Sequence, residues 1–192
     1  QNPYTDEDYF AYVDGKPRYD GVRDFFASRG ITLPEGDPSD GPAAQTICGL
    51  GNRKNDLFNT VLARDGIQPY PGSRRWVDRL HESGMAMAVV SSSRNAAAVL
   101  KAAGMVEDFS VLVDGNRSKT ERLPGKPAPD TYLRGAELLG VPAEQCVVVE
   151  DAVSGVRAGA AGGFGMVLGV NRGVGADRLR EAGADRVVDD LD

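Results

Sequence analysis

From Pro71 onward, short apolar runs alternate with segments in which apolar residues recur every three or four positions, and the connections between them are short. This alternation predicts strands and helices in turn, the pattern of a parallel sheet with helices on both faces. We expect helices at 73–83, 94–103, 130–139, 153–161 and 176–182, and strands at 85–90, 109–113, 146–149, 166–170 and 186–188. The fold class predicted for residues 69–192 is therefore α/β, with a Rossmann-like parallel sheet core.

Glycine marks the end of several of these predicted helices. Gly84, Gly104 and Gly140 each follow a helical segment directly. Helices often end with one residue in the left-handed conformation, which glycine adopts without steric cost. The glycines therefore support the predicted helix ends.

Residues 1–68 have a different pattern. They contain no strong β-type run, whereas the segments 21–29 and 52–64 have the apolar spacing of helices. Between them, residues 33–42 read LPEGDPSDGP, which is typical of a polar loop. We expect a small all-helical cap domain, joined to the core near 68–72, where the sequence PYPG supplies two prolines and a glycine.

Composition excludes several classes of protein. The formal net charge is −6 and the basic residues are scattered, so a nucleic-acid partner is not expected. No apolar run is long enough to cross a bilayer and no segment resembles a secretory signal, so we expect no membrane partner and a cytoplasmic protein. Two cysteines, Cys48 and Cys146, make no disulfide framework, and with the single histidine His81 they offer too few ligands for a zinc site.

Two adjacent carboxylates follow the apolar run at 146–149. Because that run is continuously apolar and β-branched, it predicts a strand buried on both faces, with Glu150 and Asp151 at its carboxyl end. Ligands bind at that edge of open α/β sheets, and paired carboxylates suit a hard cation such as Mg²⁺. The alternative is that Asp151 only caps the following helix.

Three serines follow the predicted strand 85–90. Ser91 and its neighbours place hydroxyl and backbone N–H groups at the start of the next helix, an arrangement suited to an oxyanion. Asn95 lies within the first predicted helical turn and could reach the same anion. The alternative is that the serines are helix N-caps.

One lysine lies in a turn-rich segment. Lys126, in GKPAPD, is held between Gly125 and Pro127, so its charge can be aimed at one place. The alternative is an exposed lysine in a surface turn. A fixed cation and two acids near one sheet edge together predict a phosphate and metal site.

This order of a serine after one strand, a lysine before a helix and paired acids after another strand resembles the haloacid dehalogenase superfamily of phosphotransferases. The sequence segments GKPAPD and VVVEDAVSGVRAG are the basis of this resemblance. It implies that Ser91 and Lys126 hold the transferred phosphoryl group, and that Glu150 and Asp151 bind Mg²⁺ as the cofactor.

The sequence segments SSSRN, YPG and RKND resemble those of the β-phosphoglucomutase subfamily. The resemblance extends over nearly the whole chain. That resemblance implies that Arg18 and Lys54 of the helical cap grip a second, non-transferring phosphate, with Ser93 and Asn95 of the core helping to hold it. It also implies a small-molecule sugar phosphate as the partner and a monomer as the active unit.

The resemblance also implies a nucleophilic aspartate in an Asp-x-Asp-Gly motif ahead of the cap. Residues 1–192 contain no such motif, because none of the Asp-Gly pairs, among them Asp14-Gly15 and Asp114-Gly115, has an aspartate two places earlier. We therefore expect that the cap is incomplete at its N-terminus, that the first core strand lies outside this chain, and that residues 1–192 alone are inactive.

The expected function is magnesium-dependent sugar-phosphate phosphoryl transfer through an aspartyl-phosphate, interconverting β-glucose 1-phosphate and glucose 6-phosphate. One alternative is a sugar-phosphate phosphatase of the same superfamily. Another is a non-catalytic protein that binds sugar phosphates.

Overall fold

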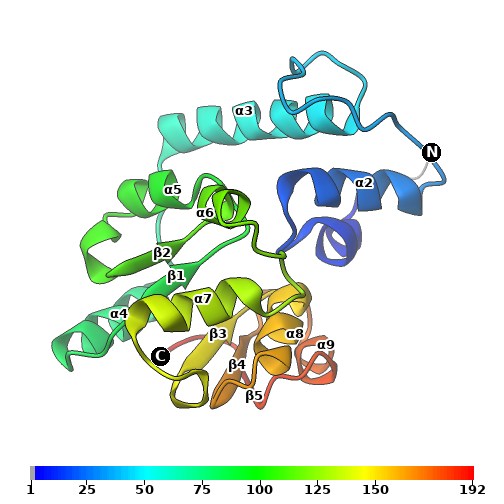
Figure 1. The fold of residues 1–192 in the computed structure, drawn as a ribbon. Coiled ribbons are helices and arrows are strands. Elements are labelled where there is room, and N and C mark those ends of the chain that lie inside the picture. Colours follow the sequence, from blue (N-terminus) through cyan, green and yellow to red (C-terminus); the bar gives the residue numbers. More distant parts are fainter. Residues whose placement is uncertain (1–2) are drawn as a thin grey trace. The chain divides into compact units, whose positions relative to one another are not determined.

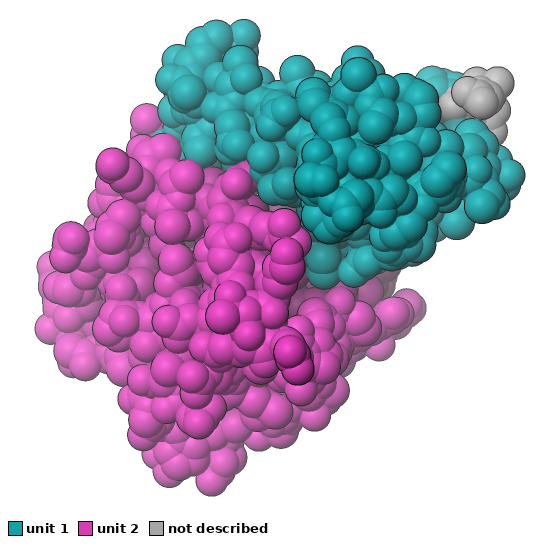
Figure 2. Space-filling model, turned by 45° about the horizontal axis from the view of Figure 1, so that its top comes forward, with its two compact units in different colours: residues 1–67 teal, residues 68–192 magenta. Residues whose placement is uncertain are grey.

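The computed structural model describes residues 3–192. The chain divides into two compact units, residues 1–67 and 68–192, which Figure 2 distinguishes by colour. The boundary lies within one or two residues of the join expected at PYPG. The two units are described separately below.

All regular elements in the described part of the first unit are helical. They are the short α1 (Asp6–Asp8), the π-helical segment η1 (Tyr9–Val13), α2 (Arg18–Ser28) and α3 (Ile47–Asp65). Both expected helices are present, and α3 starts earlier than predicted because the Thr46 side chain accepts a hydrogen bond from the Gly49 N–H and caps it. The segment 33–42 is irregular, as predicted.

The second unit contains two parallel sheets. One pairs β1 (Ala88–Val90) with β2 (Val111–Val113), and the other has the order β3 (Val147–Glu150), β4 (Met166–Val170), β5 (Arg186–Val188). Within residues 3–192, no backbone pairing joins β1 to β3. The parallel α/β fold class is confirmed, with the sheet divided between these two strands.

Helices connect and cover the strands. They are α4 (Pro71–Glu82), α5 (Ala96–Ala102), α6 (Gly115–Thr120), α7 (Asp130–Leu139), α8 (Val153–Ala161) and α9 (Ala176–Glu181), with short 3₁₀ turns η2 (Val106–Asp108) and η3 (Ala143–Gln145). In Figure 1, α7 runs in front of the strands; it contacts β1 and β2 and also meets α8, which lies on β3 and β4. Helix α7 therefore packs on the β1–β2 sheet and contacts the helix that covers the second sheet.

Two predicted strands are shorter than expected. The run 85–90 is a strand only from Ala88, because the Met85 N–H donates to the Leu80 carbonyl and completes the end of α4. The run 109–113 pairs only from Val111, the residue opposite Ala88. The glycines after α4, α5 and α7 have the positive φ angles expected of left-handed caps.

Burial of β3 was predicted incorrectly at its first residue. Val148 is 5% exposed and faces α8, where Gly159 lies against it. Val147, whose side chain projects to the opposite face, is 54% exposed. Cys146 precedes the strand and is half-buried, with its Sγ 3.4 Å from the Pro142 carbonyl oxygen. The strand is therefore buried mainly on the side of α8.

Candidate functional site

Glu150, the last residue of β3, lies at the centre of a dense hydrogen-bond cluster. Its Oε1 accepts hydrogen bonds from the Lys126 ammonium (2.5 Å) and the Tyr132 hydroxyl (2.9 Å). Its Oε2 accepts from the backbone N–H groups of Asp151 (2.8 Å) and Ala152 (3.2 Å). A carboxylate has about four acceptor positions, so the protein itself satisfies all of them.

Glu150 and Lys126 form a buried ion pair whose side chains are 10% and 6% exposed. Burial alone would raise the pKa of Glu150, but the Lys126 charge and the hydrogen bonds to its carboxylate outweigh burial and hold that pKa below its usual range. Glu150 is therefore ionised at neutral pH, and it holds the lysine in place.

Lys126 is drawn into the edge of the sheet instead of lying in a surface turn, so the alternative interpretation of an exposed lysine is wrong. Besides Glu150, its ammonium donates to the Val90 carbonyl oxygen at 3.3 Å. It also lies 4.6 Å from the centroid of the Tyr132 ring. The ammonium thus joins the carboxyl end of β1 to the carboxyl end of β3.

Tyr132 is a member of this cluster that the sequence analysis missed. It lies in the first turns of α7, is 8% exposed, and contacts the ring of Phe164 edge to face at 6.0 Å. Burial raises the pKa of the Tyr132 hydroxyl and the Glu150 charge raises it further, so the hydroxyl stays a donor. Its position in the sequence, six residues after the lysine and on the inner face of a predicted helix, could have indicated that it belongs to the cluster.

The three serines form a turn after β1, and the alternative interpretation, in which they are helix N-caps, is wrong because the N-cap of α5 is Asn95. The Ser91 N–H donates to the Val113 carbonyl at 2.9 Å, which extends the contact between β1 and β2. The Ser91 Oγ accepts from the Ser93 N–H, and the Ser93 Oγ accepts from the Asn95 N–H. Helix α5 begins only after Asn95. Ser91 directly follows the residue whose carbonyl binds Lys126.

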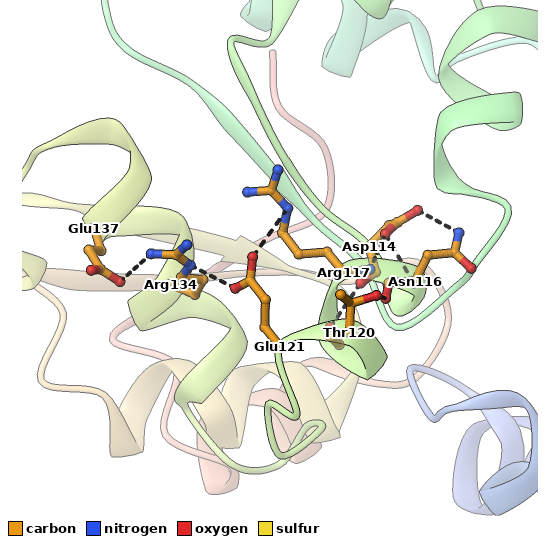
Figure 3. Close-up of polar contacts among 8 residues, drawn as sticks. Asp114, Asn116, Arg117, Thr120, Glu121, Arg134 and Glu137 are labelled. Carbon is orange, nitrogen blue, oxygen red and sulfur yellow. Dashed lines mark hydrogen bonds and ion pairs between the residues drawn. The ribbon is translucent and has the colours of Figure 1, made fainter.

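Asp114 fixes this serine turn from the neighbouring strand. It follows β2, is 8% exposed, and caps α6 by accepting from the N–H groups of Asn116 and Arg117. The Asn116 side chain in turn donates to Asp114 (Figure 3). It also donates to the Arg94 carbonyl, and the Gly115 N–H donates to the Ser93 carbonyl. The Asp114 carboxylate is thus engaged in capping α6. This agrees with the sequence, in which Asp114-Gly115 lacks the preceding aspartate of the nucleophile motif.

A chain of alternating charges connects α6 with α7 on either side of the lysine segment (Figure 3). Glu121 lies 3.9 Å from Arg117 and accepts from Arg134 at 2.8 Å, and Arg134 also donates to Glu137 at 2.7 Å. Residues 121 and 134 lie on either side of Lys126 in the sequence. These ion pairs therefore hold together the two ends of the segment that carries Lys126.

Asp151 follows Glu150 and is exposed at the same edge. Among residues 3–192, no group of three or more His, Cys, Asp or Glu side chains is placed to hold a metal ion. Mg²⁺ often uses only one or two carboxylates and completes its shell with water and phosphate oxygens. Asp151 fits such a role, whereas Glu150 would have to exchange one of its four hydrogen bonds to join it.

The first unit contains its own cationic cluster. Arg18, at the start of α2, donates to the side-chain oxygens of Asn52 (3.1 Å) and Asn55 (2.6 Å) on α3. Lys54 lies on the same helix; surrounding protein lowers the pKa of its ammonium, and the charge of Arg18 lowers it further. The structure thus brings Arg18 and Lys54 near one another within this unit.

The predicted core residues meet in the second unit. Ser91, Lys126, Glu150 and Asp151 all lie at the carboxyl ends of β1 and β3, and Ser93 and Asn95 belong to the same serine turn. The roles predicted for these residues stay predictions.

The family model of the haloacid dehalogenase-like hydrolases matches residues 3–163. The chain belongs to this family. A β-phosphoglucomutase from Mycobacterium bovis is 50% identical over 187 residues, which cover 96% of this chain and 71% of that protein. This similarity places the chain in the β-phosphoglucomutase-like subfamily of haloacid dehalogenase-like hydrolases.

Two other relatives extend the comparison. Hexitol phosphatase A from Escherichia coli is 33% identical over 177 residues, or 91% of this chain and 72% of that protein. The crystal structure of a β-phosphoglucomutase from Clostridium difficile superposes with a TM-score of 0.80 at 19% identity, covering 98% of this chain and 77% of that one. The haloacid dehalogenase fold is therefore confirmed. No helix in residues 3–192 is long and apolar enough to cross a membrane.

Proposed function

We propose that the protein carrying this chain is a magnesium-dependent sugar-phosphate mutase that interconverts β-glucose 1-phosphate and glucose 6-phosphate. Its family membership supports sugar-phosphate phosphoryl transfer or hydrolysis as the broader activity. The observation that carries the proposal is the Lys126 ammonium, which is fixed at the sheet edge by Val90 and Glu150. A buried, oriented cation next to a serine turn is suited to a phosphoryl group.

In this proposal, Lys126 and Ser91 bind the transferring phosphoryl group. The ammonium has three N–H donors, and Val90 and Glu150 accept two of them, so the third is the one directed to a phosphoryl oxygen. The Ser91 hydroxyl can donate to a second oxygen while its Oγ accepts from the Ser93 N–H. Both donors are held in place before substrate arrives, which lowers the cost of stabilising charge in the transition state.

Asp151, with Glu150 as its neighbour, would hold Mg²⁺. When bound, the ion neutralises charge on the phosphoryl oxygens. The nucleophilic aspartate is proposed to come from a segment other than residues 1–192. Two observations support this: Asp114 is engaged as a helix cap, and β1 and β3 carry no backbone pairing to one another within the described residues.

Arg18 and Lys54 would bind the second phosphate of a sugar bisphosphate. Arg18 is pre-oriented by two asparagine side chains, so less entropy is lost when it grips an anion. Two cations in one helical unit suit a doubly charged group. A mutase needs this grip because its intermediate carries two phosphates, whereas hydrolysis of a small monophosphate does not.

A sugar-phosphate phosphatase is the second candidate, favoured by the similarity to hexitol phosphatase A. Turnover of β-glucose 1-phosphate by the protein in the presence of Mg²⁺, measured as glucose 6-phosphate formed against inorganic phosphate released, separates the two. Phosphate release without glucose 6-phosphate would overturn the mutase assignment.

The variant Arg18→Gln sharpens this test. Loss of one charge-assisted contact should lower kcat/KM for the mutase reaction roughly 10- to 100-fold. Hydrolysis of a small monophosphate should change less than about threefold, because no second phosphate is bound. Arg53→Gln, on the exposed side of α3, is the matched control and should leave both activities unchanged. Equal losses in the two assays for Arg18→Gln would contradict the mutase proposal.

A further inference from the structure

Tyr132 contacts both members of the Lys126–Glu150 ion pair. Its hydroxyl donates to Glu150 Oε1 at 2.9 Å, the same oxygen that accepts from Lys126. The Lys126 nitrogen lies over its ring, 4.6 Å from the ring centroid, within the range of a cation–π contact. One side chain thus touches the cation and its counter-ion at once.

The orientation of Tyr132 is itself fixed. The residue is 8% exposed, and its ring meets Phe164 edge to face at 6.0 Å. Phe164 is held close by Gly162, where an added Cβ would lie 2.4 Å from the Phe164 ring. A ring clamped on its edge and anchored by its hydroxyl cannot turn away from the lysine without breaking both contacts.

These contacts restrict the direction of the Lys126 ammonium. Val90 and Glu150 accept two of its N–H groups, and the Tyr132 ring packs against the nitrogen, with its centroid 4.6 Å away. Without the hydroxyl, Oε1 would keep one donor only, and the carboxylate could rotate toward other partners. Without the ring, the ammonium would lose its cation–π contact. Either loss widens the range of directions open to the remaining N–H.

We propose that Tyr132 is a positioning residue that aims the Lys126 ammonium at the phosphoryl group. The inference rests on the proposed function of Lys126. It assigns Tyr132 no contact with the substrate, so its effect on the reaction passes entirely through the lysine and its carboxylate.

Two variants of the full protein separate the contributions of the hydroxyl and the ring. Tyr132→Phe keeps the ring and removes the hydroxyl, and Tyr132→Leu removes both. Side-chain ¹⁵N relaxation of the Lys126 ammonium reports its order directly. We expect the order parameter of the ammonium to be lower in Tyr132→Phe than in wild type, and lower still in Tyr132→Leu. Unchanged lysine order in both variants would overturn the inference.

Steady-state kinetics separate an effect on the orientation of Lys126 from an effect on substrate affinity. We expect kcat for sugar-phosphate turnover to fall roughly 10-fold in Tyr132→Phe and roughly 100-fold in Tyr132→Leu, with KM within about twofold of wild type. A rise in KM at constant kcat would overturn the inference, because it would mean that the tyrosine binds substrate.

Tyr4→Phe is the matched control, since it removes a hydroxyl from a tyrosine that is 55% exposed in the other unit. It should leave lysine order, kcat and the thermal midpoint unchanged. A thermal midpoint of Tyr132→Phe close to that of the control shows that the protein folds. If wild-type protein has no turnover but lysine order still depends on Tyr132, the proposed function fails, whereas the finding that Tyr132 orders Lys126 stands without a role in phosphoryl transfer.

Discussion

The carbonyl oxygen of Val90 lies 3.3 Å from the ammonium of Lys126, although the two residues are 36 positions apart in the chain. The same ammonium reaches Glu150, so one side chain connects the ends of β1 and β3. Within the described residues, no backbone hydrogen bonds perform this connection. Lys126 therefore contributes to the fold as well as to the candidate site.

Replacing Lys126 by methionine should destabilise the protein strongly. The Glu150 carboxylate would remain buried without its counter-ion, which typically costs about 3–5 kcal/mol. The free energy of unfolding in urea measures this loss, with Lys101→Met, an exposed lysine of α5, as the control. The double variant Lys126→Met with Glu150→Gln should recover part of the loss. A change below about 1 kcal/mol in the single variant would contradict a buried ion pair.

Gly155→Ala should separate α8 from the end of β3. An added Cβ would lie 1.8 Å from Glu150 Oε1, too close for any contact, so the carboxylate or the helix must move. Overpacking of this kind costs about 1–3 kcal/mol, and it should also lower activity by displacing Lys126. Gly41→Ala, where a Cβ would meet no atom within 4 Å, is the control for thermal unfolding. Equal midpoints for the two variants would refute the close approach.

Asp114→Ala should weaken α6 by removing its N-cap. Loss of a side-chain cap costs about 0.5–2 kcal/mol. Asp114→Asn retains an oxygen that can accept from the Asn116 and Arg117 N–H groups, and should cost less. Amide hydrogen exchange at Arg117 reports the cap locally. Faster exchange in the alanine variant alone is the expected result, and no difference between the two would show that the cap carries little energy.

Asp190 should make stability depend on pH in the acid range. The hydrogen bond from Arg172, together with one from the Leu191 N–H, holds the pKa of Asp190 below its usual range. A lowered pKa contributes stability that is present above the unfolded-state pKa of about 3.9 and is lost as pH falls through the folded-state value. Between about pH 5 and pH 2, wild type should therefore lose more stability than Asp190→Asn. Asp177→Asn, at a position 91% exposed, should follow wild type.

Local sequence patterns predicted the parts of this site whose positions follow from neighbouring residues in the chain. The apolar run before Glu150 and Asp151 placed both carboxylates at a strand end, and β3 ends at Glu150. Gly125 and Pro127 indicated a restrained Lys126. These predictions succeeded because strand and turn signals are read over a few neighbouring residues.

The contacts that give the site its geometry could not be predicted in this way. Tyr132 meets Glu150 across 18 positions, and nothing in the spacing of either residue indicates that the hydroxyl and the carboxylate share a hydrogen bond. Strand lengths failed for the same reason, because β1 and β2 are strands only where Ala88 meets Val111. The contact between Tyr132 and Glu150 and the lengths of β1 and β2 both depend on segments that are far apart in the sequence.

Glu150 and Asp151 are consecutive residues with opposite surroundings, one enclosed by four hydrogen bonds and the other at the surface. Substitutions at these two neighbouring positions should therefore have different effects. Changes at Glu150 should reduce the yield of folded protein, whereas changes at Asp151 should leave expression intact and, on the proposed function, remove only the Mg²⁺-dependent activity. Asp151 is thus the position at which an inert but well-folded form could be made to trap a bound sugar phosphate.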